Sequence, residues 1–189
     1  MKIGLYFGSF NPIHTGHLII ASFVKNQTDL QKVWLVVSPQ NPLKVSKTLL
    51  NEYHRLHLVK LAIDDDPDLE ASDIEFRLPK PSYTIDTLTY LKEKYPQHEF
   101  SIIMGSDSFN NISRWKNPEL LLASYQFFIY KRRGFPVLSA HKNVTVVQAP
   151  LLEISATQIR NLINQNKSIR YLVPEKVLKE IEDNRYYKS

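Results

Sequence analysis

Two short segments of the sequence carry the residues whose types and spacing could do chemistry, and that chemistry is phosphate binding. The first segment, residues 8–17, reads GSFNPIHTGH. Gly8 and Ser9 are small, so backbone N–H groups can approach a phosphate closely at this turn. A helix expected to start near Thr15 would add its free N–H groups and the positive end of its dipole. The first segment therefore has the elements of an anion site.

His14 and His17 lie about one helical turn apart in this segment and could point the same way. No acidic residue occurs before Asp29, so the segment suits phosphate better than a divalent metal held by side chains alone. The alternative is an ordinary capped helix with two polar histidines. His54 and His57 have the same spacing without a glycine turn, and we interpret them as structural or surface residues. A zinc pair has little support, because no third and fourth ligands are evident.

The second segment, residues 154–160, reads ISATQIR. Ser155 is a good helix N-cap, and Gln158 completes a capping box. Arg160 does not fit that structural interpretation, because a cation in the first turns of a helix opposes its dipole at a cost of up to about 1 kcal/mol. A bound phosphate would reverse this penalty, with Ser155, Thr157 and Arg160 facing it. A surface arginine is the alternative.

Predicted strands and helices alternate along the chain and would position these two segments. Strands are expected at 2–7, 32–38, 69–77, 99–104, 126–130 and 144–148, and helices at 15–27, 51–64, 84–95, 118–124, 156–165 and 174–183. The apolar side of the 51–64 helix is expected to carry Tyr53, Leu56, Leu58, Val59 and Ile63. The alternation predicts an α/β fold: a Rossmann-like, doubly wound, mainly parallel sheet with helices on both faces and a short helical C-terminal part. In such a sheet ligands bind at the carboxyl ends of the strands, where the first segment lies.

Length and composition narrow the classes of protein. The chain has 189 residues, a net charge of +5 and no cysteine, so we expect one domain over 1–189 and exclude disulfide scaffolds, Cys-ligated metal centres and a thiol nucleophile. No apolar run approaches the ~18 residues of a membrane span, and the N-terminus does not read as a signal peptide. We therefore expect a cytoplasmic protein. The modest positive charge indicates an anionic partner, either a small phosphorylated molecule or nucleic acid.

Taken together, the two segments resemble a known pair of signatures. GSFNPIHTGH resembles the G-x-F-(D/N)-P-x-H-x-G-H signature of the nucleotidylyltransferase superfamily, and ISATQIR resembles its second signature, I-S-S-T-x-I-R. Three inner features are similar to one branch, the bacterial nicotinate-mononucleotide adenylyltransferases: PSYTIDTL at 81–88, IMGSDS at 103–108 and Trp115. Ser9, Asn11 and Ala156 depart from the commoner residues. Asn11 keeps hydrogen-bonding capacity without the charge.

The resemblance implies adenylyl transfer from ATP to nicotinate mononucleotide, giving deamido-NAD and pyrophosphate by direct attack without a covalent intermediate. Mg²⁺ would accompany ATP, held mainly by phosphates and water and not by a protein metal site. The residues that match the family's catalytic positions are His14, His17 and Arg160. The expected ATP-binding residues are Gly8, Ser9, Phe10, Asn11, His17, Gly105, Asp107, Ser155, Thr157 and Arg160. The expected acceptor-binding residues are Lys44, Thr84 and Trp115.

Two alternatives stay open at this point. A sister adenylyltransferase would use nicotinamide mononucleotide or another phosphorylated acceptor, and a non-catalytic module would bind a nucleotide or RNA. The basic residues of the C-terminal helix alternate with acids, which indicates a solvated face, so no nucleic acid and no membrane partner are expected. The sequence leaves a homo-oligomer open.

Overall fold

The computed structural model describes residues 1–40, 49–138 and 141–188, and a six-stranded sheet lies at its centre. The strands are β1 (Lys2–Gly8), β2 (Lys32–Val37), β3 (Leu69–Ser72), β4 (Glu99–Gly105), β5 (Gln126–Tyr130) and β6 (Val144–Val147). All pair in parallel, in the order β3-β2-β1-β4-β5-β6. Because β1 pairs with both β2 and β4, the strand order reverses there. The crevice at the carboxyl ends of these strands is where open α/β sheets bind ligands.

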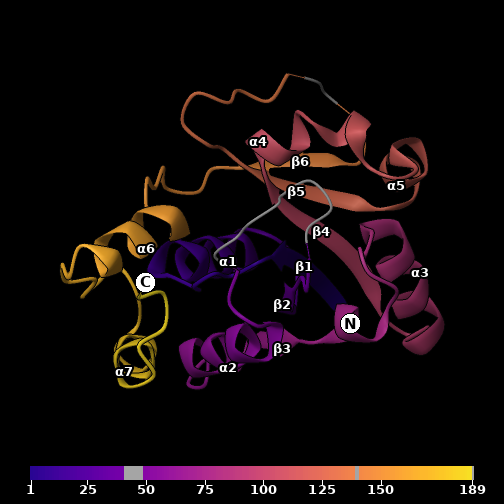
Figure 1. Cartoon of the computed structure of the whole chain (residues 1–189). Coiled ribbons are helices and arrows are strands. Elements are labelled where there is room, and N and C mark those ends of the chain that lie inside the picture. The colour runs from indigo at the N-terminus through magenta and orange to yellow at the C-terminus, as the bar shows by residue number, and fades with distance from the viewer. Residues whose placement is uncertain (41–48, 139–140, 189) are drawn as a thin grey trace.

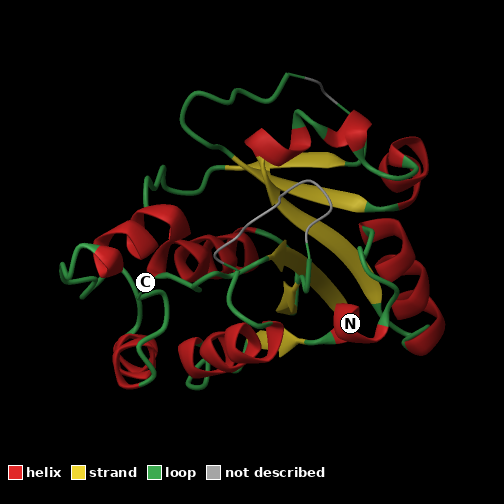
Figure 2. Cartoon of the chain, in the orientation of Figure 1, coloured by secondary structure: helices red, strands yellow, loops and turns green. Residues whose placement is uncertain are grey.

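Helices cover both faces of the sheet, as Figures 1 and 2 show. One face carries α1 (Thr15–Gln27), α2 (Glu52–Ala62), α6 (Ala156–Asn164) and α7 (Glu175–Asp183). The other carries α3 (Thr84–Lys94), α4 (Ser106–Phe109) and α5 (Pro118–Ser124), with short 3₁₀ helices η1 (Ile74–Arg77) and η2 (Ile112–Arg114). The predicted Rossmann-like, doubly wound fold is confirmed. None of the helices in the described ranges is long and apolar enough to cross a membrane.

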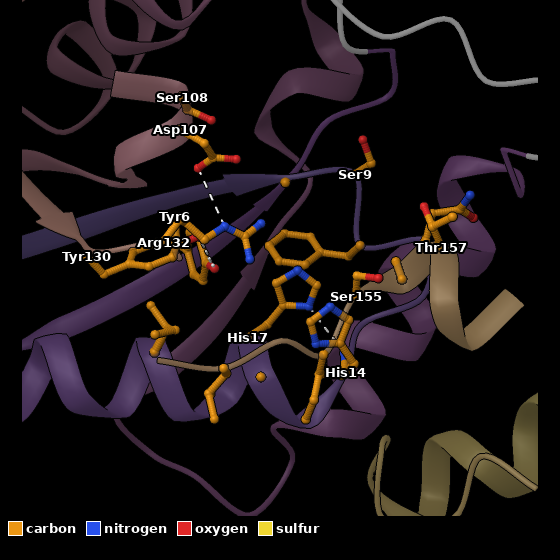
Figure 3. Close-up of a pocket in the computed structure, with 18 of the residues that line it drawn as sticks. Tyr6, Ser9, His14, His17, Asp107, Ser108, Tyr130, Arg132, Ser155 and Thr157 are labelled. Carbon is orange, nitrogen blue, oxygen red and sulfur yellow. Dashed lines mark hydrogen bonds and ion pairs between the residues drawn. The ribbon is translucent and has the colours of Figure 1, made fainter. Parts of the chain in front are cut away.

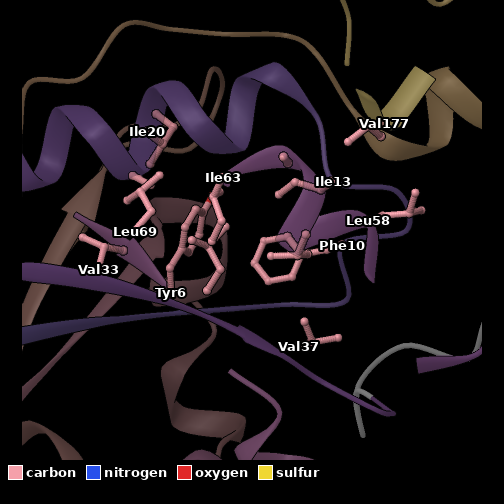
Figure 4. Close-up of a cluster of buried hydrophobic side chains, with 14 of the residues drawn as sticks. Tyr6, Phe10, Ile13, Ile20, Val33, Val37, Leu58, Ile63, Leu69 and Val177 are labelled. Atoms are coloured by element: carbon pink, nitrogen blue, oxygen red, sulfur yellow. The ribbon is translucent and has the colours of Figure 1, made fainter. Parts of the chain in front are cut away.

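The core consists of two apolar clusters, one on each face of the sheet. Successive strand residues point to opposite faces, so Tyr6 enters the cluster beneath α1 and α2 whereas Leu5 enters the cluster beneath α3. Ile103 and Ile102 of β4 divide in the same way. Figure 4 shows the first cluster, to which Tyr6 of β1, Ile20 of α1 and Leu58 of α2 belong. Burial on both faces explains why the strands read as near-continuous apolar runs.

The C-terminal part joins the start of α1, where the first segment ends. Thr15 donates its backbone N–H to the Leu172 carbonyl at 2.9 Å and its hydroxyl to the Tyr171 carbonyl at 3.2 Å. Val177 and Ile181 of α7 are buried in the same cluster as α1. The short helical C-terminal part that the sequence predicted is therefore packed against the start of α1 and the cluster beneath it.

Two local predictions were wrong. The strand expected at 69–77 ends at Ser72, and 74–77 forms η1 instead, because the buried Glu75 accepts side-chain hydrogen bonds that turn the chain inward. On α2, Tyr53 was expected on the apolar side, but it is 65% exposed, while Arg55 is fully buried. The helices α4 and η2 were not predicted.

Candidate active site

The first segment leaves β1 and turns tightly into α1. Phe10 takes a positive φ of 44° and folds its ring back over Gly8. A Cβ on Gly8 would lie 2.8 Å from Cζ of that ring, so no other residue fits there without moving Phe10. A Cβ on Gly16 would come within 3.1 Å of His14 Nδ1. Gly8 is therefore explained by close packing against Phe10, and Gly16 by close packing against His14.

His14 and His17 stack on each other, with their ring centroids 3.6 Å apart and their planes at 24° (Figure 3). The His14 backbone N–H donates to Nδ1 of His17 at 3.3 Å. Because Nδ1 accepts, a neutral His17 ring carries its proton on Nε2, as a donor. Burial, together with the charge of Arg132, lowers the pKa of His14 to about 4, so this ring is neutral near pH 7. The predicted pair is thus brought together.

The second segment begins α6 as predicted, with Ser155 as the N-cap that accepts from the Gln158 N–H at 3.2 Å. Arg160 donates through Nη1 to the Asn11 carbonyl at 2.7 Å and through Nη2 to the Thr157 hydroxyl at 3.2 Å. The structure therefore joins the two segments through Arg160, although they lie near opposite ends of the chain. This contact also gives a reason for a cation early in α6.

The first and second segments form two walls of the site, and the ends of β4 and β5 form a third. Arg132 lies beside Asp107, with Nε 3.5 Å from Oδ1. The hydroxyls of Tyr6 and Tyr130 lie 3.0 Å apart beneath them, and burial raises the pKa of both. Arg132 was not predicted from the sequence as a site residue. Its position directly after a buried strand was the available signal.

These walls enclose a cavity of about 390 Å³. It is lined by ten of the predicted residues: Gly8, Ser9, Phe10, Asn11, His14, His17, Asp107, Ser155, Thr157 and Arg160. Lys131, Arg132 and Arg160 are cationic, and Asp107 is the sole carboxylate among the described residues that line it. Gly105 ends β4 outside this lining. Such a cavity favours a polyanion.

A second cavity of about 680 Å³ adjoins the first, and Gly8, Ser9, Asp107 and Ser108 line both. The structure places the predicted residues Thr84 and Trp115 in this second cavity, together with Tyr83. Lys44, which was also predicted to bind the acceptor, lies outside the described residues. The site therefore consists of two compartments that meet at the carboxyl ends of β1 and β4.

Glu75 forms part of the wall of the second cavity and was missed from the sequence. It is 2% exposed, and its carboxylate accepts from the Ser82 hydroxyl at 2.8 Å and the Thr87 hydroxyl at 2.9 Å. Burial raises the pKa of Glu75, while hydrogen bonds from these hydroxyls and from Ser38 work against that rise. The prediction of a strand over 69–77 hid this residue, since an acid in an edge strand is expected to face solvent.

The sheet is parallel with a strand-order reversal, and a glycine turn follows its first strand. Arg160 joins this turn to the segment at the start of α6. Together these features indicate a Rossmann-like nucleotidyltransferase. The family model for cytidylyltransferase-like proteins matches residues 5–162. More narrowly, the chain belongs to the family of the nicotinate-nucleotide adenylyltransferases. The resemblance read from the sequence is therefore confirmed.

The relatives that show this are similar over their full length. A protein of Cytophaga hutchinsonii named "Probable nicotinate-nucleotide adenylyltransferase" is 55% identical over 191 residues, covering 100% of both chains. A protein of Flavobacterium psychrophilum with the same name is 50% identical over 193 residues, again covering 100% of both.

A solved structure supports the fold. The nicotinic acid mononucleotide adenylyltransferase of Plasmodium falciparum, complexed with NaAD, superposes with a TM-score of 0.84. It is 22% identical to this chain, with 98% of this chain and 97% of the other covered. At this identity the likeness concerns the fold, and it extends over nearly the whole chain.

Proposed function

We propose that this protein transfers the adenylyl group of ATP to the 5′-phosphate of nicotinate mononucleotide, releasing pyrophosphate and forming deamido-NAD. The observation that carries the proposal is the contact of Arg160 with the Asn11 carbonyl. It joins two anion-binding segments in one cationic cavity, and a second cavity opens beside it for the acceptor. Membership of the adenylyltransferase family supports the same reaction.

The reaction needs alignment and charge neutralisation more than covalent chemistry. An oxygen of the acceptor's 5′-phosphate forms a bond to the α-phosphorus of ATP. The bond from that phosphorus to the bridging oxygen breaks, and its electron pair leaves with pyrophosphate. The two phosphates would meet where the cavities join, beside Gly8 and Ser9. No protein nucleophile takes part in this scheme.

The first cavity is proposed to bind ATP. His17 would donate from Nε2 to a phosphate oxygen of ATP, in the orientation that the His14 N–H fixes. The backbone N–H groups near Ser9 and Phe10 would receive the joined phosphates. Arg160 would hold the β- and γ-phosphates. The remaining predicted ATP contacts are Gly8, Asn11, Gly105, Asp107, Ser155 and Thr157, with Asp107 near the ribose.

The second cavity is proposed to bind the acceptor. Thr84 and Trp115 line it, and Trp115 offers a flat aromatic face to the pyridine ring. Its larger volume of about 680 Å³ suits a mononucleotide. Lys44 is proposed to meet the acceptor phosphate. Among acceptors with a pyridine ring, we propose nicotinate mononucleotide, in keeping with the names of the relatives.

Mg²⁺ is proposed to arrive with ATP. Within the described ranges, no three or more His, Cys, Asp or Glu side chains gather to hold a metal. In the first cavity, Asp107 lies 3.5 Å from Arg132, which reduces its availability. This donor set fits a cation that stays on the phosphates and water, where it would neutralise phosphate charge. We further propose that residues 1–189 form one nucleotidylyltransferase domain and that the protein acts in the cytoplasm.

The test is an acceptor panel. Purified protein with ATP and MgCl₂ is assayed for pyrophosphate release with nicotinate mononucleotide, nicotinamide mononucleotide, phosphopantetheine and FMN in turn. We expect nicotinate mononucleotide to give the highest kcat/KM. Turnover with another acceptor alone would overturn the proposed substrate. No turnover with any acceptor would favour a module that binds nucleotides without catalysis.

A further inference from the structure

Arg55 is a buried cation that the proposed chemistry does not use. It lies on α2 with 0% of its surface exposed. Among the described residues its guanidinium forms no salt bridge, and Glu52, the acid whose charge acts to raise its pKa, is paired with Lys80 at 2.6 Å. Removing such a charge from water costs several kcal/mol unless hydrogen bonds compensate for it, and burial lowers the pKa of Arg55. A core position filled for stability alone would favour an apolar side chain.

The guanidinium is compensated by main-chain oxygens. Nε donates to the Leu50 carbonyl at 2.7 Å, and Nη1 donates to the carbonyls of Ser9 at 2.5 Å and Ser38 at 2.8 Å. Nη2 donates to the Pro39 carbonyl at 3.0 Å. These four acceptors belong to the loop after β1, the loop after β2 and the residue before the N-cap of α2. One side chain thus fastens three pieces of backbone at the strand-order reversal.

The hydrogen bond from Arg55 to the Ser9 carbonyl fixes the orientation of the peptide group between Ser9 and Phe10. In a trans peptide the C=O and the following N–H point in opposite directions. With the Ser9 carbonyl held by Arg55, the Phe10 N–H is turned away from the guanidinium. Ser9 and Phe10 line the first cavity, and Arg55 lines neither cavity. Arg55 therefore acts from behind the loop whose amides are proposed to meet phosphate.

A chain of hydrogen bonds continues from Arg55 to the second segment. Leu50, whose carbonyl binds Arg55, donates its N–H to Oδ1 of Asn11 at 3.1 Å. The Asn11 carbonyl in turn accepts from Arg160. Asn11 is only 5% exposed, so its side chain is fixed in the interior. The placement of Arg160 is thus connected to the placement of the loop before α2.

We propose that Arg55 is a positioning residue for adenylyl transfer, holding the loops after β1 and β2 so that the Phe10 amide faces the phosphates and Asn11 anchors Arg160. This inference rests on the proposed function. Arg55 touches neither substrate and acts through Ser9, Asn11 and Arg160. A lysine cannot replace it, because one ammonium carries three donors on a flexible stem whereas the planar guanidinium carries five in a fixed fork.

The test compares Arg55→Lys and Arg55→Met with a destabilised control on the same helix. Leu58→Ala is that control, since Leu58 is fully buried in α2 and lines neither cavity. For each variant we would measure the melting temperature, and kcat and KM for both substrates well below that temperature. We expect both Arg55 variants to lose about 10²-fold in kcat, as a misplaced catalytic loop does. The Leu58→Ala variant should melt earlier and keep its kcat.

Equal kcat for the Arg55 variants and the Leu58→Ala control would overturn the inference. So would Arg55 variants that fail to fold where the control folds, because the role would then be structural. Calorimetric binding of ATP separates this result from failure of the proposed function. If the wild-type protein binds ATP without transferring it, weaker ATP binding by Arg55→Lys than by Leu58→Ala still supports the positioning role, and equal binding refutes it.

Discussion

The buried ring of His14 should make the protein sensitive to mild acid. Its pKa falls from 6.5 in the unfolded chain to about 4 in the folded one, so the unfolded state binds the extra proton first. The free energy of unfolding therefore keeps its full value above pH 6.5, and the part that depends on a neutral His14 is lost as the pH falls toward 4. With about 1.4 kcal/mol for each pKa unit, the full loss is roughly 3 kcal/mol. The ring is 5% exposed, so solvent screening reduces this little.

The perturbation that isolates this effect is His14→Asn. Asparagine keeps a good N-cap for α1 and does not titrate. Urea unfolding of both proteins at pH 7.5 and 4.5 gives the free energy of unfolding at each pH. We expect the wild-type protein to lose roughly 2.5 kcal/mol more than the variant between these values. A matched control, His57→Asn, replaces an exposed histidine and keeps His14, so it should retain the loss seen in the wild-type protein.

A wild-type protein and a His14→Asn variant that differ by the same free energy at both pH values would refute the reasoning. That result would mean that His14 titrates in the folded protein as it does in the unfolded chain. The burial of the ring against His17 would then not restrain its protonation.

Three further predictions concern the two cavities. His17→Ala should lower kcat by about 10²-fold or more in a folded protein, as measured by steady-state pyrophosphate release; near wild-type kcat/KM would exclude its donor role. Arg160→Ala should raise the KM for ATP more than that for nicotinate mononucleotide, and unchanged ATP kinetics would contradict its assignment. Glu75→Ala should leave the buried Ser82 hydroxyl without its acceptor, at about 1–3 kcal/mol in the free energy of unfolding, while Thr87 keeps its bond to the Tyr83 carbonyl, and should raise the KM of the acceptor. Equal increases in both KM values would argue against a local effect on the acceptor cavity.

Much of the fold was predictable because the signals are local. Strands buried on both faces leave continuous apolar runs, and the helix over 15–27 has the predicted bounds. Ser155 was predictable as an N-cap because the capping pattern lies within a few residues. The positions of the two segments in the sequence do not predict that they meet in the fold. The resemblance implied that both bind ATP, and the structure shows that Arg160 joins them.

Arg55 and Glu75 were missed because their partners are distant in the sequence or belong to the backbone. Helical periodicity ranks residues by hydropathy, so it assigned Tyr53 to the apolar side and left Arg55 to solvent. The partners of Arg55 are carbonyl oxygens, which every residue has and no motif records. Glu75 is satisfied by hydroxyls seven and twelve residues away. Such buried polar groups become visible only when tertiary structure assembles their partners.

The stereochemical course of the reaction tests the central claim most directly. ATP carrying sulfur at one configuration of its α-phosphorus is incubated with nicotinate mononucleotide and the wild-type protein, and the configuration of the dinucleotide product is determined. Direct attack across the junction of the two cavities predicts a dinucleotide with inverted configuration at that phosphorus. Retention would show a covalent intermediate on the protein, and the absence of any dinucleotide from unmodified ATP under the same conditions would contradict the proposed activity itself.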